Sequence, residues 1–161
     1  MDKWDRLQIL EDIKRLKARY FRMVDTHDPE GFANVFTPDG VLDLREAFNA
    51  PNMKEPASAS SNPTPVRPIV IEGRENILAA AKKGMNMLSV HHGHMPEIDI
   101  QSETRATGIW SMEDVVWKVR DGKLGAKMHG YGHYHEVYEK LADGWHIKVC
   151  KLTRLYLLME G

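Results

Sequence analysis

The N-terminal part of the chain repeats apolar side chains at helical spacing. Between residues 5 and 24 the apolar positions recur three and four apart, at Leu7, Ile9, Leu10, Ile13, Leu16, Tyr20, Phe21 and Met23 or Val24. The other side of this segment carries the basic residues Lys14, Arg15, Lys17 and Arg19. The pattern predicts a long amphipathic helix with these cations on its polar side. A short second helix is predicted over about 29–36, because Asp28 can cap it and Pro29 suits its first position.

The second half of the chain alternates apolar and polar residues, which predicts long β-strands. Their expected ranges are 89–100, 106–119, 125–140 and 145–157, with hairpin turns at Arg120-Asp121-Gly122-Lys123 and Ala142-Asp143-Gly144. Shorter elements come first: a turn over 37–40 leading into a strand over 41–44, a strand over 69–71 and a helix over 73–88. Helices followed by an antiparallel meander predict an α+β fold, in which a curved, cone-shaped sheet wraps around the helices and encloses a pocket.

The segment 46–68 has little periodicity and is rich in Pro, Ala, Ser and Asn, so it predicts a long loop. Long loops in compact domains serve as lids or as arms that reach another subunit, and a disordered excursion is the alternative that the pattern leaves open. Its large apolar residues, Phe48 and Met53, would anchor such a lid or arm.

Asp114 is the acid on the apolar face of the second long strand. That face carries Thr104, Ala106, Gly108, Trp110, Met112, Asp114 and Val116. A carboxylate there loses hydration and needs a partner, such as a histidine N–H or an arginine. Asp114 is therefore a candidate site residue, and a purely structural ion pair at the wet end of the strand is the alternative.

The histidine nearest to this acid cannot be chosen from the alternation alone. Counting back from Ile98 and Ile100 places His92 on the inner face and His91 on the outer one. Gly93 and Pro96 can mark a β-bulge that resets the phase and turns His91 inward instead. The alternation therefore leaves both His91 and His92 as candidates for the histidine near Asp114.

Composition narrows the class of protein. The 161 residues, 42% of them hydrophobic, suit a single domain over 1–161. Its 22 basic and 23 acidic residues give a net charge of −1 and are mixed along the chain. We therefore expect neither nucleic acid nor a membrane as a partner. The start of the chain has no signal-peptide pattern, which predicts a cytoplasmic protein, and Cys150 is expected to be a small buried hydrophobe.

A histidine-rich strand raises the question of a metal. His133, His135 and Glu139 match part of the cupin ligand pattern. The glycine expected upstream falls on Lys127, and a helix-rich first half does not suit that fold. We expect no metal site and no cofactor.

Four stretches of the chain resemble the SnoaL-like branch of the nuclear transport factor 2-like superfamily. They are KARYFRMVD from Lys17 to Asp25, HHGHMPEI from His91 to Ile98, SETRATGIW from Ser102 to Trp110, and MED from Met112 to Asp114. The resemblance spans roughly residues 8–156 and is strongest to bacterial bile-acid 7α-dehydratases, with scytalone dehydratase and ketosteroid isomerase more distant.

This resemblance implies a set of site residues. It assigns catalysis to Tyr20, Asp25, His91 and Asp114, and so favours His91 over His92. Arg154 matches a pocket arginine, and Trp110 is expected to line the pocket. The chain departs from the pattern at Leu44, where the dehydratase has a tyrosine, and on the third long strand, where His129 and Tyr131 stand in place of an asparagine. These departures argue against a bile acid as the substrate.

The implied activity is that of a cofactor-independent lyase that eliminates water from a hydroxylated aromatic or alicyclic compound. Asp114 would hold the tautomer of His91, Tyr20 would donate a hydrogen bond to the departing oxygen, and Asp25 would orient Tyr20 or a water. A retro-aldol cleavage, an isomerisation of the ketosteroid type and a non-catalytic binding or scaffold protein are the alternatives. Related proteins are commonly dimers or trimers, so a homo-oligomer is expected.

Overall fold

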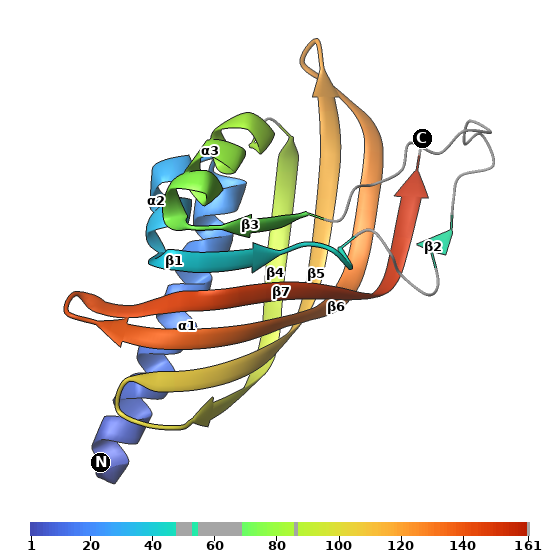
Figure 1. Cartoon of the computed structure of the whole chain (residues 1–161). Helices are drawn as coiled ribbons and strands as arrows, with labels where there is room; N and C mark the ends of the chain where they lie inside the picture. Colours follow the sequence, from blue (N-terminus) through green and yellow to red (C-terminus); the bar gives the residue numbers. More distant parts are fainter. Residues whose placement is uncertain (48–52, 55–68, 86, 161) are drawn as a thin grey trace.

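A helical layer covers one side of a curved sheet in the computed structural model (Figure 1). The structure describes residues 1–47, 53–54, 69–85 and 87–160. The helices are α1 (Lys3–Asp25), α2 (Pro29–Asn34) and α3 (Arg74–Gly84). The strands are β1 (Phe36–Asp43), β2 (Met53–Lys54), β3 (Val70–Glu72), β4 (Leu88–Ile100), β5 (Arg105–Arg120), β6 (Lys123–Leu141) and β7 (Gly144–Glu160).

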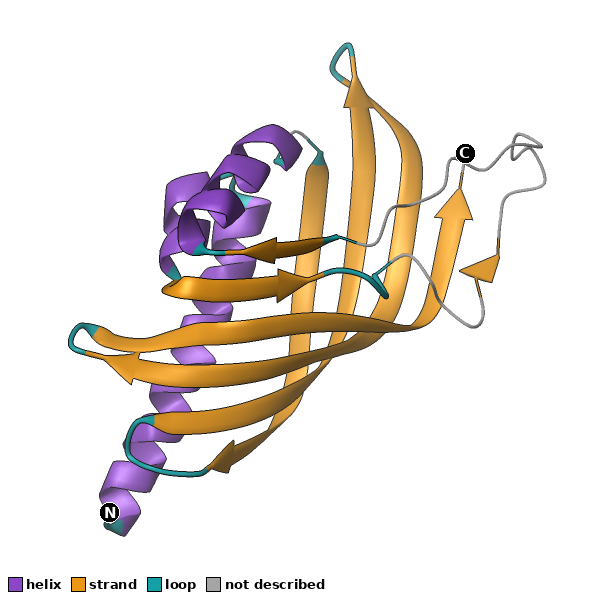
Figure 2. Cartoon of the chain, viewed as in Figure 1, coloured by secondary structure: helices purple, strands orange, loops and turns teal. Residues whose placement is uncertain are grey.

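The strands form one sheet with the order β3-β1-β7-β6-β5-β4, and β2 pairs with β7 in addition. The four long strands make an antiparallel meander, and the helices lie together on its inner side (Figure 2). The predicted α+β fold with a curved sheet around helices is confirmed. The sheet is mixed rather than antiparallel throughout, because β1 and β2 both run parallel to β7. Alternation along one strand does not encode the direction of a neighbour.

The apolar stripe of α1 packs on the inner face of the sheet. Ile13 and Leu16 are buried between the layers, together with Trp110 and Met112 of β5. Asp28 caps α2 by accepting a hydrogen bond from the backbone N–H of Gly31 at 2.8 Å, and Pro29 takes the first position, as predicted. This short helix turns the chain back toward the sheet.

The predicted boundaries are wrong at two elements. Strand β1 starts at Phe36, inside the expected helix and before the expected turn, because the buried Phe36 pairs with Ile147 and the register shifts before Val41. Helix α3 ends at Gly84 rather than near Leu88, because Leu88 is the first residue of β4 and pairs with Trp117. Pairing with distant strands decided both boundaries.

Lys17 does not lie on the polar side of α1. It is fully buried, and its Nζ lies 2.5 Å from Oε1 of Glu136 on β6. The hydroxyl of Tyr138 donates to the other oxygen of Glu136, at 2.5 Å. The Lys17 ammonium also lies over the rings of Tyr20 and Tyr134, 3.9 and 3.5 Å from their centroids. A buried carboxylate and aromatic ring faces replace water around this cation.

The expectations for the loop over 46–68 fall mostly outside the described residues, and Phe48 is among those not described. Within this range the structure describes Glu46, the buried Ala47, and β2, whose residues Met53 and Lys54 pair with Leu157 and Leu158 of β7.

Candidate active site

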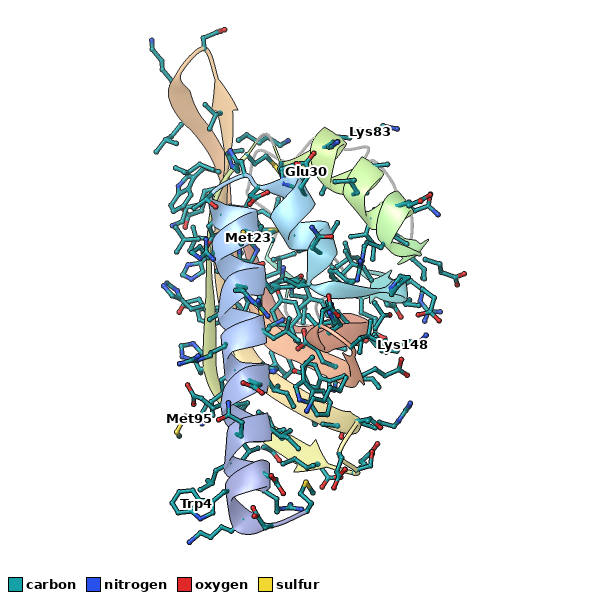
Figure 3. The ribbon with its side chains drawn as sticks, turned by 90° about the vertical axis from the view of Figure 1, so that its left-hand side faces the viewer. Trp4, Met23, Glu30, Lys83, Met95 and Lys148 are labelled. Carbon is teal, nitrogen blue, oxygen red and sulfur yellow. The ribbon has the colours of Figure 1, made fainter. Side chains whose placement is uncertain are left out.

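A β-bulge turns His91 toward the helices. Gly93 pairs with Met112 and Pro96 with Trp110, so β4 has one more residue than β5 between these pairs. Beyond the bulge Ile98 and Ile100 face inward, and before it His91 lies opposite the inward-facing Asp114. Met95, within the bulge, is 90% exposed and points away from the ribbon (Figure 3). The bulge therefore resets the alternation and places His91, not His92, on the inner face.

Asp25, the last residue of α1, holds the imidazole of His91. Its Oδ1 lies 2.6 Å from Nδ1 of His91, and its Oδ2 accepts the backbone N–H of the same residue at 2.8 Å. Ser89 donates a third hydrogen bond, at 2.9 Å. Burial by itself would raise the pKa of the Asp25 carboxyl, but the hydrogen bonds from His91 and Ser89 and the nearby imidazole hold this pKa below its ordinary value. An ionised Asp25 accepts the proton on Nδ1 and leaves Nε2 free.

Asp114 pairs with Arg154 rather than with His91. The two nitrogens at the end of the guanidinium donate to both carboxylate oxygens, at 2.7 and 2.8 Å, and both side chains are buried. Nε2 of His91 lies 4.0 Å from the nearer oxygen of Asp114, beyond hydrogen-bond distance. A Cβ at Gly130 of β6 would overlap both Arg154 and Asp114, so this glycine makes room for the pair. The expected role of Asp114 as the group that holds His91 is wrong, and Asp25 takes that place.

A cavity of about 560 Å³ lies between the helices and the sheet, and these residues open into it. His91, Asp114 and Arg154 line it together with Tyr20 and Tyr134. Most of the remaining lining is apolar and comes from every layer of the fold, including Val24, Phe32, Leu42, Ile71, Ile77 and Leu152. Burial is the main cause that raises the pKa of both tyrosine hydroxyls well above the ordinary value, so both stay protonated and can donate hydrogen bonds.

A SnoaL-like domain model matches residues 5–151, which is most of the chain. The protein belongs to the SnoaL-like family. Solved structures with the same fold include a candidate scytalone dehydratase from Novosphingobium aromaticivorans DSM 12444, at 20% identity and a TM-score of 0.74, covering 97% of this chain and 90% of that one. Another is a hexachlorocyclohexane dehydrochlorinase, LinA type 2, at 15% identity and a TM-score of 0.74, covering 99% and 94%. An NTF2-like protein with a cystatin-like fold from N. aromaticivorans shares 19% identity, with a TM-score of 0.63 and coverage of 92% and 83%.

The residues that the SnoaL-like resemblance assigns to the site fall into two groups. Tyr20, Leu44 and Arg154 line the cavity with His91 and Asp114, and Asp25 lies behind the imidazole. Asp25 accepts hydrogen bonds from His91 and Ser89, so the expectation that it orients Tyr20 is wrong.

The other expected pocket residues, His129, Tyr131 and Trp110, do not line this cavity. Nε2 of His129 lies 2.7 Å from Glu113, and Tyr131 pairs with Glu113 in the ladder, on the face that alternation turns away from the helices. Trp110 faces inward, but its indole N–H donates to Tyr138 at 2.7 Å within the packed core. It lies on the same face of β5 as Asp114 but four residues away along the strand, outside the cavity lining.

Two features of the site were missed in the sequence. Tyr134 lines the cavity, and its place on the same strand parity as Gly130 and Gly132 was a usable signal. The buried pair of Lys17 and Glu136 beneath Tyr20 and Tyr134 left no such signal, because a lysine among other basic residues of a helix predicts exposure.

Within the part of the chain that the structure describes, no three or more His, Cys, Asp or Glu side chains are grouped so as to hold a metal ion. His133 and His135 lie near one another on β6, with ring centroids 6.2 Å apart, while Glu139 contacts Arg105. No helix among the described residues is long and apolar enough to cross a membrane.

Proposed function

We propose that the protein is a cofactor-independent lyase that eliminates water from a hydroxylated, largely apolar ring compound, with Nε2 of His91 as the general base. The observation that carries this proposal is the pairing of Nδ1 with Asp25, which leaves Nε2 as the basic atom facing the cavity. A base of this kind needs a fixed tautomer and a nearby anion to stabilise the imidazolium that it forms. Asp25 meets both needs.

In the proposed reaction, side chains of the cavity account for every proton that moves. Nε2 of His91 takes a proton from the carbon next to the one that bears the hydroxyl, and the electron pair of that C–H bond forms the double bond. The C–O bond breaks, and the departing oxygen receives the proton held by His91 and leaves as water. The protonated hydroxyl of Tyr20 donates a hydrogen bond to this oxygen while negative charge develops on it.

Membership of the SnoaL-like family supports an elimination reaction for this protein. The SnoaL-like family includes proteins whose names describe such reactions, a candidate dehydratase and a dehydrochlorinase, and both share the fold of this chain. The apolar lining of the cavity supports a ring compound with few polar groups. Retro-aldol cleavage would use the same base on a hydroxyl proton, and product analysis distinguishes it by the carbon skeleton.

The test is a turnover screen with hydroxylated aromatic and alicyclic compounds, followed by His91→Ala. We expect this change to lower turnover at least about a hundredfold, the size of a general-base contribution. His92→Ala is the matched control, because His92 is exposed on the other side of the same strand and should keep full activity. Ligand binding that persists in His91→Ala while turnover is lost supports catalysis. Wild-type turnover from His91→Ala would instead show that His91 is not the general base, and a screen that finds no turnover from the wild type would leave the cavity as a binding site only.

A further inference from the structure

Arg154 is the cationic side chain at the inner wall of the cavity, and its positive charge is already paired with Asp114. Besides the two bonds to Asp114, Arg154 donates through Nε to the backbone carbonyl of Ala47 at 2.9 Å, and one terminal nitrogen also contacts the sulfur of Met112 at 3.5 Å. A guanidinium has five N–H groups, so four are engaged by the protein itself. Arg154 is held as a satisfied group and not as an open anion site.

The other charged groups around the cavity do not supply an unpaired buried cation. Lys17 is buried behind the rings of Tyr20 and Tyr134, but it is paired with Glu136. Lys118 and Lys127 belong to the β5–β6 hairpin that projects beyond the body of the fold, where Lys118 is exposed and Lys127 pairs with Glu160 (Figure 1). The imidazole of His27 is exposed and bonds the carbonyl of Met87. Asp25 adds a negative charge behind His91. With Asp114 and Arg154 cancelling each other, the interior carries a net negative charge.

From this arrangement we infer that the cavity selects an uncharged ligand, and that Asp114 is the residue that sets this preference by occupying Arg154. The inference rests on the proposed function in that it defines the substrate class of the same site. A carboxylate, sulfonate or phosphate that entered the cavity would have to displace Asp114 to reach Arg154. Asp114 would then be a buried carboxylate without a partner, which is strongly unfavourable. A neutral ligand leaves the pair intact.

The test compares two fluorescent probes with the same ring system, neutral dansylamide and the anionic dansyl sulfonate. Both are smaller than the cavity, and their polar groups are similar in size. We expect the wild-type protein to bind dansylamide at least about tenfold more tightly than the sulfonate in a fluorescence titration. If the wild-type protein bound both probes equally, or bound the sulfonate more tightly, the inference would be overturned by this result alone.

Asp114→Asn then tests the residue. The amide keeps the shape of the side chain but removes the charge, so Arg154 becomes a buried cation that an anion can neutralise. We expect the sulfonate to bind at least about tenfold more tightly than to the wild type, with dansylamide changed less than about threefold. Asp114→Ala frees the same guanidinium and serves if the asparagine variant does not fold. A folded variant with no gain for the sulfonate contradicts the role of Asp114.

Two controls complete the experiment. Asp114→Asn/Arg154→Met removes both charges and should lose the gain for the sulfonate while it still binds dansylamide. Ala80→Trp fills the cavity from the half-buried face of α3 and should weaken both probes in the wild-type background, which places them in the cavity. These titrations require no turnover, so failure of the proposed lyase activity and failure of this inference give different results.

Discussion

Asp25 and Asp114 approach the imidazole of His91 from opposite sides, and their partners give them different roles. Asp25 lies 2.6 Å from Nδ1, whereas Asp114 lies 4.0 Å from Nε2 and gives both oxygens to Arg154. A histidine between two carboxylates is fixed by the one that it bonds. The other carboxylate is paired with the guanidinium and does not bond Nε2. This nitrogen therefore stays available to take a proton from the substrate.

The lowered pKa of Asp25 predicts how stability depends on pH. Hydrogen bonds and the imidazole outweigh burial and hold the folded-state pKa below the unfolded-state value of about 3.9. The ionised carboxylate therefore stabilises the fold above that value, and this contribution is lost as the pH falls through the lower folded-state pKa. We expect Asp25→Asn to be less stable than the wild type near neutral pH, with a difference in unfolding free energy that shrinks as the pH falls below about 4.

Urea denaturation at a series of pH values measures this difference. Asp99→Asn is the control, because Asp99 is exposed on the same strand as His91. Its unfolding free energy should follow the wild type through the same pH range. A difference between Asp25→Asn and the wild type that stays constant as the pH falls would show that Asp25 does not gain its stabilisation from ionisation.

The close approach of α1 and β4 brings Asp25 to His91, and Gly93 permits it. A Cβ added at Gly93 would lie 2.5 Å from Cε2 of Phe21 on α1. The Phe21 ring is nearly parallel to the imidazole of His91, with centroids 6.3 Å apart, and it also packs against Tyr20 and Tyr134. The ring is held on several sides, so a side chain at residue 93 must push helix and strand apart.

We expect Gly93→Ala to destabilise the protein by about 1–3 kcal/mol, as overpacking does, and to lower turnover by loosening the contact between Asp25 and His91. Gly84→Ala is the matched control, because a Cβ there meets nothing within 4 Å. Its unfolding free energy should stay within about 1 kcal/mol of the wild type. Thermal unfolding and steady-state kinetics on both variants decide the point, and equal behaviour of the two would show that the helix–strand spacing does not depend on Gly93.

At the scale of the whole molecule, a buried polar network joins the helical layer to the sheet under the cavity. Lys17 of α1 bonds Glu136 of β6, which accepts from Tyr138, which in turn accepts from Trp110 of β5. These residues come from three separate elements, α1, β5 and β6, and all four are buried. Because the Lys17 ammonium also lies over the rings of Tyr20 and Tyr134, the network supports the wall of the cavity that carries the hydroxyl donors.

Removing one partner of this pair should cost far more than removing both. Lys17→Met leaves Glu136 as an uncompensated buried carboxylate, for which a loss of about 3–5 kcal/mol is expected. Lys17→Met/Glu136→Gln has no buried charge and keeps an acceptor for Tyr138, so it should recover most of that loss. Lys14→Met, at an exposed position one turn earlier, should change stability by less than about 0.5 kcal/mol. Urea denaturation checks all three, and a double variant no more stable than Lys17→Met would contradict the charge argument.

The sequence by itself determined which helices and long strands form and the face of its strand on which Asp114 lies. Helical spacing located α1, alternation located the long strands, and the cap of Asp28 and Pro29 located α2, because these signals are local. The same alternation put Asp114 on the inner face. It also left a conflict at Gly93 and Pro96 that only a bulge resolves, and the structure has that bulge.

Only the tertiary structure decided which groups meet. His91 and Asp25 are 66 residues apart, and Arg154 and Asp114 are 40 apart, so no spacing rule links either pair. Period two fixes the face of a side chain but not which strand or helix supplies its partner. Asp114 pairs with Arg154, two strands away in the same sheet, and not with His91. Lys17 pairs with a carboxylate on β6 and is buried, although the residues around it in the helix sequence are basic. The curvature of the sheet and the packing of the helices on it decide these partners together, because a buried charge is stable only beside a group of opposite charge or a hydrogen-bond partner.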